Sequence, residues 1–130
     1  MIGIVIVAHG GLANGYLKAI EHVLGPQAGV VAIAIEGDYD RDSKQNEICI
    51  AADAVDTGDG VLIVTDIFGA SPSNLSLKAC RPPKRRILYG ANLPMLLKLA
   101  SSRHLSLSDA VRVALEAGRK YIDSHEVQPD

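Results

Sequence analysis

The stretch Met1-Ile2-Gly3-Ile4-Val5-Ile6-Val7-Ala8-His9-Gly10 opens the chain and indicates its fold class. Residues 2–7 are aliphatic or glycine and show no alternation of apolar and polar positions. This pattern predicts a strand that is buried on both faces, as in a parallel sheet. His9 and two glycines, Gly10 and Gly11, follow the strand. Because ligands collect at the carboxyl ends of parallel strands, His9 is the first candidate for a functional nucleophile.

Strand-like and helix-like segments alternate along the rest of the chain. Further aliphatic runs predict strands at 30–35, 61–65 and 86–89. Apolar residues spaced by three and four predict helices at 12–24, about 41–55, 71–80, about 94–100 and 107–122. Gly25 is expected to end the first helix, one of Asp40, Asp42 or Ser43 to cap the second, and Ser106 to cap the last.

This alternation predicts an α/β fold with a doubly wound, mainly parallel four-stranded sheet of order 2-1-3-4 and helices on both faces. The short connections and the length of 130 residues are typical of a single domain spanning residues 1–130. Residues 123–130 form a polar tail, with room for at most a short C-terminal edge strand.

Composition excludes several classes of function. The formal net charge of −2 gives no reason to expect a nucleic acid or an anionic membrane as partner. No apolar run approaches the roughly 18 residues needed for membrane insertion, and the start shows no signal peptide. Cys49 and Cys80 are expected to be small core or half-buried residues in a reducing, cytoplasmic environment.

No metal site is predicted, because the cysteines and histidines lack the spacing of metal ligands. His22, His104 and His125 are expected to be solvated surface residues. Motifs for nucleoside triphosphates and dinucleotides are missing, and the serine at position 71 lacks the second glycine of a nucleophile elbow. A phospho-aspartate receiver would use Asp66, but it would also need acidic residues after the first strand.

Three predicted strands end in polar or glycine-flanked residues, His9, Asp66 and Asn92, which should meet at one edge of the sheet. A carboxylate bonded to one imidazole nitrogen fixes the tautomer and leaves the other nitrogen free to accept a phosphoryl group. Asp66 would then stabilise the cationic, phosphorylated ring. The alternative is that His9 is a structural residue hydrogen-bonded under a loop.

The segment Gly69-Ala70-Ser71-Pro72-Ser73 reads as a helix start, with Ser71 as the N-cap and Pro72 in the first turn. Free backbone amides between Gly69 and Ser73 would also suit an anion. A cap alone and a cap combined with an anion site both remain open. Asn92 is interpreted as a turn residue leading into the next helix.

Three stretches, Ile4–Gly10, Val64–Asn74 and Gly90–Leu96, together resemble the enzyme IIA domain of the mannose-family phosphoenolpyruvate-dependent sugar phosphotransferase system (PTS EIIA). The resemblance extends from Met1 to about Tyr121. It implies a phosphotransferase component that accepts phosphate on His9, at Nε2, from phospho-HPr and passes it to an enzyme IIB partner. By the same matching, Asp66 orients the histidine, and the region of Ser71 helps to hold the phosphoryl group.

The resemblance also implies a homodimer and no metal or organic cofactor. Family members often end in an edge strand exchanged between subunits, whereas only residues 124–130 remain here after the last predicted helix. The sequence identifies neither the sugar nor the enzyme IIB partner, and a role in transport and a role in regulation both remain open. Two alternatives are the phosphoryl-donor subunit of a dihydroxyacetone kinase system and a non-catalytic phosphate-sensing module.

Overall fold

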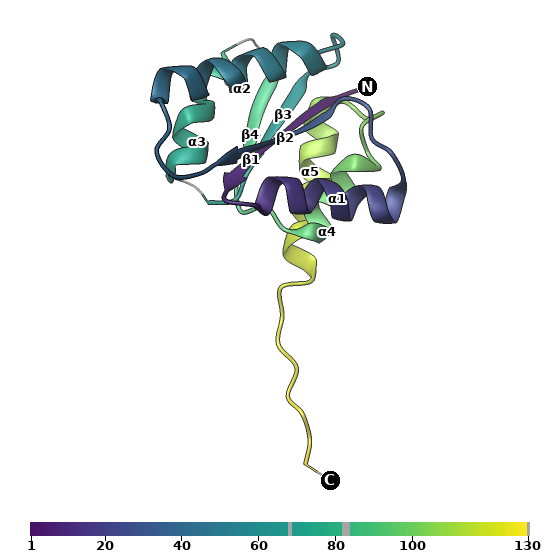
Figure 1. The fold of residues 1–130 in the computed structure, drawn as a ribbon. Helices are drawn as coiled ribbons and strands as arrows, with labels where there is room; N and C mark the ends of the chain where they lie inside the picture. The colour runs from purple at the N-terminus through teal and green to yellow at the C-terminus, as the bar shows by residue number, and fades with distance from the viewer. Residues whose placement is uncertain (68, 82–83, 130) are drawn as a thin grey trace.

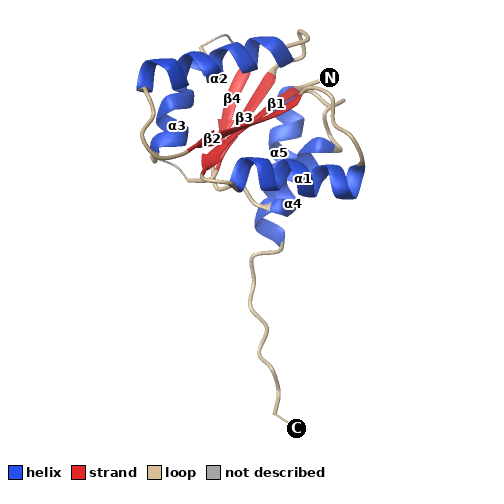
Figure 2. Cartoon of the chain, in the orientation of Figure 1, coloured by secondary structure: helices blue, strands red, loops and turns tan. Residues whose placement is uncertain are grey.

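A computed structural model describes residues 1–67, 69–81 and 84–129 of the chain. Its centre is a parallel sheet of order β2-β1-β3-β4, which confirms the predicted α/β class and strand order (Figure 2). The strands are β1 (Gly3–His9), β2 (Val30–Ile35), β3 (Val61–Thr65) and β4 (Arg85–Leu88). The central strand β1 is buried from Gly3 to Ala8, as its uninterrupted aliphatic run predicted.

Helices cover both faces of the sheet (Figure 1). One layer contains α2 (Arg41–Val55), α3 (Ser71–Ser76) and the 3₁₀ turn η1 (Leu77–Cys80). The other contains α1 (Leu12–Leu24), α4 (Leu93–Ala100) and α5 (Leu107–Lys120). Every α-helix follows a predicted one closely, except that the third is a short α-helix continued by a 3₁₀ turn.

Two cores result, one on each face of the sheet. Ile4, Ile6 and Ala8 of β1 pack into the core beneath α1, α4 and α5. Val5 and Val7 pack into the core beneath α2 and α3. Because side chains alternate along a strand, position 9 has the same orientation as positions 5 and 7, on the side of α2 and α3.

Most predicted helix ends are confirmed, and one is wrong. Gly25 ends α1 with a φ of 86°, Asp40 caps α2 by accepting from the Ser43 amide, and Ser106 caps α5 by accepting from the Asp109 amide. Ser71, expected to be an N-cap, is instead the first residue of α3. The N-cap is Ala70, whose extended backbone begins the helix without a side-chain hydrogen bond.

Other boundary details also differ from expectation, and α5 ends at Lys120, two residues before the predicted end at Ile122. His9 is the last residue of β1 rather than the first after it, and β4 begins at Arg85, one residue early. Residues 122–129 contain no strand in this chain and lead away from the sheet (Figure 1). Among the described residues, no helix is long and apolar enough to cross a membrane.

Candidate functional site

His9 and Asp66 meet at the carboxyl edge of the sheet. The His9 Nδ1 atom lies 2.8 Å from Asp66 Oδ2, so the two groups share a hydrogen bond. The His9 side chain is 47% exposed, whereas that of Asp66 is only 8% exposed. The carboxylate thus lies beneath the imidazole and contacts one ring nitrogen. This geometry suits an imidazole whose Nδ1 holds a proton while Nε2 is available as a nucleophile.

Backbone amides hold the Asp66 carboxylate in place. The His9 amide donates to Oδ2 at 3.0 Å, and the Ile67 amide donates to Oδ1 at 2.9 Å. Burial alone would raise the pKa of Asp66, but the hydrogen bonds from the His9 amide, the His9 ring and the Ile67 amide hold it below its usual value. Asp66 is therefore ionised at neutral pH. The bond from the His9 amide was not predicted from the sequence, because a backbone N–H donor does not depend on the residue type at that position.

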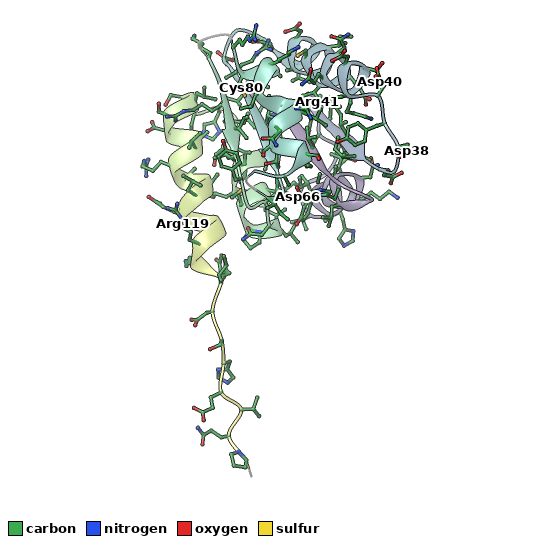
Figure 3. The ribbon with its side chains drawn as sticks, turned by 90° about the vertical axis from the view of Figure 1, so that its left-hand side faces the viewer. Asp38, Asp40, Arg41, Asp66, Cys80 and Arg119 are labelled. Carbon is green, nitrogen blue, oxygen red and sulfur yellow. The ribbon has the colours of Figure 1, made fainter. Side chains whose placement is uncertain are left out.

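Adjacent strands create this contact. Residues 3–7 of β1 pair in register with residues 61–65 of β3, and Val7 lies opposite Thr65. Asp66 follows Thr65 directly, which brings it to the level at which β1 ends. Figure 3 shows the molecule from the side on which α3 lies in Figure 1. Asp66 lies near the centre of this view, and Asp38 and Asp40 lie in the loop before α2.

The loop between Asp66 and α3 carries the other predicted site residues. The Gly69 amide already donates to Ser73 Oγ at 2.9 Å, and Ser73 Oγ donates to the Ala70 carbonyl. These two bonds give Gly69 and buried Ser73 a structural role in shaping the loop. The Ala70 and Ser71 amides make no hydrogen bond to another described residue, which leaves them available to an anion.

Other polar candidates have structural or surface positions. Asn92 caps α4 by accepting from the Met95 amide, and its own side-chain amide donates to the Gly118 carbonyl. This confirms its interpretation as the turn residue before a helix. His22, His104 and His125 are exposed, as predicted. Within the described ranges, no group of three or more His, Cys, Asp or Glu side chains is arranged to hold a metal ion.

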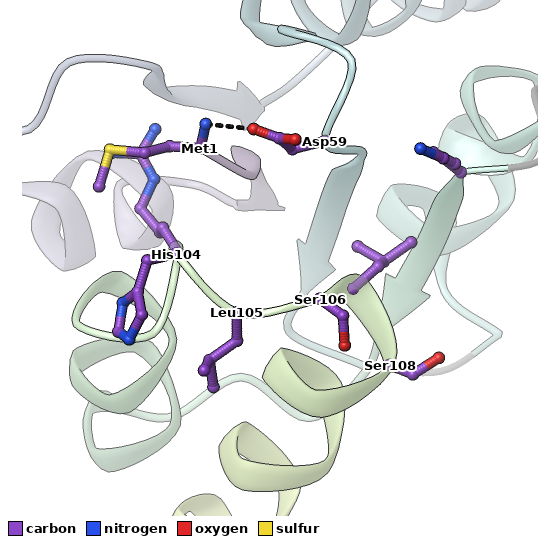
Figure 4. Close-up of a pocket in the computed structure, with 9 residues that line it drawn as sticks. Met1, Asp59, His104, Leu105, Ser106 and Ser108 are labelled. Atoms are coloured by element: carbon purple, nitrogen blue, oxygen red, sulfur yellow. Dashed lines mark hydrogen bonds and ion pairs between the residues drawn. The ribbon is translucent and has the colours of Figure 1, made fainter.

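A separate hollow of about 560 Å³ lies at the opposite edge of the sheet, where the strands begin (Figure 4). Its lining includes Met1, Asp59, Lys84 and residues 103–108. The amino group of Met1 donates to Asp59 there. Met1, Asp59 and Lys84 precede β1, β3 and β4, whereas His9 and Asp66 lie where β1 and β3 end, so this hollow is distinct from the site at the carboxyl edge.

A comparison with protein families identifies the family of the chain that contains this site. Residues 3–115 match the model of the EIIA-man family, described as PTS system fructose IIA component. The chain belongs to this family. The match contains the complete sheet, His9, Asp66 and the loop that leads into α3. It thereby confirms the mannose-type EIIA resemblance inferred from the three sequence stretches.

Individual relatives agree with the family. The chain is 29% identical over 131 aligned positions to the PTS system mannose-specific EIIAB component of Escherichia coli. The alignment covers 98% of this chain and 41% of the relative. The EIIA chain therefore spans about two fifths of that protein. A putative phosphotransferase enzyme IIA component of E. coli is 27% identical over 86% of this chain and 77% of the relative.

Solved structures show the same architecture. Phosphotransferase system component EIIA from Streptococcus agalactiae has a TM-score of 0.85 and 28% identity, covering 95% of this chain and 97% of that one. A mannose/sorbose specific IIA subunit from Enterococcus faecalis, at 19% identity, shares the fold with a TM-score of 0.83 over 98% of this chain and 97% of that one.

Proposed function

We propose that this EIIA chain is a phosphoryl carrier, which accepts phosphate on His9 Nε2 from phospho-HPr and transfers it to an enzyme IIB partner. The observation that carries the proposal is the exposed imidazole held through Nδ1 by an ionised carboxylate whose side chain is only 8% exposed. Membership of the EIIA-man family supports the transfer of phosphate from phospho-HPr to an enzyme IIB. The sugar and the particular enzyme IIB lie outside the proposal.

The transfer needs little from the protein beyond position and charge. The lone pair of Nε2 attacks phosphorus in line with the P–N bond of the donor phosphohistidine, and that bonding pair returns to the donor ring nitrogen. As the new bond forms, His9 becomes a phosphorylated ring that keeps its proton on Nδ1. Asp66, 2.8 Å from Nδ1, stabilises the resulting positive charge. Transfer to the acceptor reverses these steps.

The loop before α3 is proposed to hold the phosphoryl oxygens. The free amides of Ala70 and Ser71 are the donors for this role, and the Ser71 hydroxyl adds a third. Gly69 and Ser73, which bond to each other, would act by shaping the loop rather than by touching the phosphate. This assigns the four residues two different tasks within one phosphate-binding segment.

A homodimer and a cytoplasmic location are also part of the proposal. A carrier that exchanges phosphate with HPr must share its compartment, and the pair of subunits is what the resemblance to mannose-type EIIA domains implies. Light scattering of the purified chain tests the oligomeric state directly. A monomeric mass at the concentration used for transfer would remove the dimer from the proposal while leaving the carrier chemistry intact.

The experiment for the carrier role is labelling from phosphoenolpyruvate in the presence of enzyme I and HPr. Wild-type protein is expected to take up about one phosphate per chain, in an acid-labile and base-stable form typical of phosphohistidine. His9→Ala should take up none, whereas His22→Ala, which removes an exposed histidine of α1, should label normally.

Three results would contradict the proposal. Labelling of His9→Ala at the wild-type rate would move the phosphate to another residue. A wild-type chain that binds phosphate reversibly without covalent label would indicate the phosphate-sensing module instead. Transfer of the label to a dihydroxyacetone kinase subunit, but not to an enzyme IIB, would favour the other alternative.

A further inference from the structure

Helix α1 carries a tyrosine whose hydroxyl reaches the loop that follows β4. Tyr16 Oη donates to the Ala91 carbonyl at 3.1 Å, in the loop between β4 and α4. The Tyr16 ring packs against the core beneath α1, α4 and α5. A phenylalanine would bury the same ring, so packing alone does not require the hydroxyl. The hydrogen bond to Ala91 is what tyrosine adds at this position.

The same loop is bonded to the peptide that leads into Asp66. The Ala91 amide donates to the Thr65 carbonyl at 3.0 Å. The pairing of β3 with β4 ends one residue earlier, at Val64, so Ala91 provides the donor that the strand no longer supplies. The Thr65 carbonyl is part of the planar peptide that joins Thr65 to Asp66. The bond from Ala91 therefore fixes the orientation of the peptide that carries the carboxylate of the site.

These contacts close a ring that contains both groups of the site. Asp66 contacts His9 Nδ1 at 2.8 Å, and the Ala91 amide holds the peptide before Asp66. Tyr16 holds the Ala91 carbonyl, and the first turn of α1 leads from Tyr16 back toward His9. Because β3 lies between β1 and β4 in the sheet, the ring spans the end of β3. A change at Tyr16 can therefore reach Asp66 without any direct contact between the two side chains.

Glycines adjoin both segments that the Tyr16 hydrogen bond joins. Gly10, with a φ of 57°, follows His9, and Gly90, with a φ of 70°, precedes Ala91. Glycine restricts the backbone least of all residues, so neither segment strongly fixes its own direction. The hydrogen bond from α1 to the Ala91 carbonyl supplies a constraint that the local chain does not.

We propose that Tyr16 is a positioning residue for phosphoryl transfer, which acts through the Ala91 loop to hold the Asp66 carboxylate beneath the His9 ring. The proposal rests on the carrier function proposed above, and it extends the site to a residue that touches neither the imidazole nor the phosphoryl group. During transfer the His9 ring gains positive charge, which Asp66 stabilises while it stays bonded to Nδ1. Without the Tyr16 hydroxyl, the peptide before Asp66 is held less firmly, and a smaller share of the molecules keeps that bond.

Tyr16→Phe tests this role, because phenylalanine keeps the ring and removes only the hydroxyl. In single-turnover transfer from phospho-HPr, the variant is expected to be about fivefold slower at saturating donor, as for the full loss of one neutral hydrogen bond. By ¹⁵N NMR, a smaller fraction of its neutral His9 rings should carry the proton on Nδ1. Tyr121→Phe is the matched control, since it removes the hydroxyl of an exposed tyrosine and keeps the ring that Lys120 contacts. This control should match wild type in both measurements.

A double-mutant cycle shows whether Tyr16 acts through Asp66. In the Asp66→Asn chain the contact that Tyr16 positions is already impaired, so adding Tyr16→Phe should slow transfer by less than about 1.5-fold. The same fivefold loss in both backgrounds would overturn the proposal, because Tyr16 would then act by another route. A transfer rate and a tautomer ratio at wild-type values in Tyr16→Phe would also overturn it, even if urea denaturation showed a loss of stability, since Tyr16 would then be purely structural.

A second measurement applies if Tyr16→Phe does not fold. In the wild-type chain, hydrogen exchange of the Ala91 amide should slow when His9 is phosphorylated, because the charged ring strengthens the bond to Asp66 and with it the ring of contacts. Unchanged exchange at Ala91 would contradict the proposal. In every folded variant, complete labelling of His9 at long times keeps the carrier function intact, so a failure at Tyr16 is separate from a failure at His9.

Discussion

The substitution Asp66→Asn tests the central contact of the site with almost no change in shape. Asp66 Oδ2 accepts from both the amide and the ring of His9, at 3.0 Å and 2.8 Å, while Oδ1 accepts from the Ile67 amide at 2.9 Å. Asparagine offers one oxygen in place of two. Whichever way the amide turns, its NH₂ group must face at least one backbone N–H that has lost its acceptor.

Both orientations of asparagine impair transfer. With its oxygen toward His9, the ring bond survives, but it no longer has a charged acceptor, which weakens stabilisation of the phosphorylated ring by about 1.5–3 kcal/mol. With its NH₂ toward His9, Nδ1 must become the acceptor, so the proton moves to Nε2 and removes the nucleophile. Because about 1.4 kcal/mol corresponds to a factor of ten, we expect transfer to slow by about 100-fold.

Rapid-quench transfer from phospho-HPr measures this rate, and ¹⁵N NMR of labelled histidine reports the tautomer of His9. Asp38→Asn removes an equally negative but exposed carboxylate on the same side of the molecule, and should leave both readouts unchanged. Transfer by Asp66→Asn within about threefold of the wild-type rate would refute the reasoning. So would the same loss in Asp38→Asn, because net charge rather than the His9 contact would then be responsible.

The remaining predictions concern stability. Gly3→Ala should lower the free energy of unfolding by about 1–3 kcal/mol, since the new Cβ would overlap Val55; Gly15→Ala, in α1 with nothing within 4 Å, should raise it by about 0.5–1 kcal/mol. Urea denaturation measures both, and a neutral Gly3→Ala would show that α2 can shift. Because the pKa of Asp66 is lowered by folding, its contribution is present above the unfolded value of about 3.9 and is lost as pH falls through the folded pKa. The stability difference between wild type and Asp66→Asn should therefore shrink below about pH 4, and a difference that stays constant down to pH 2 would contradict this.

Local sequence patterns predicted the elements of the fold well, because each depends on neighbouring residues. The aliphatic run before His9 could only be a strand buried on both faces, and short connections between strands and helices require parallel pairing. The error at Ser71 has an equally local cause. Serine before proline is a common cap and first-turn pair, but the chain enters α3 one residue earlier, through the extended backbone of Ala70.

The amino-acid sequence by itself determined the four strands, their order and the pair of side chains at the ends of β1 and β3, since hydrophobic periodicity and strand-end chemistry are properties of short segments. Only the tertiary structure decided that Asp66 also binds the His9 backbone and that Gly69 and Ser73 satisfy each other. The first contact depends on the register between β1 and β3, and the second depends on the course of the loop that leads into α3. His9 and Asp66 are far apart in the chain, so no local pattern encodes the distance between them.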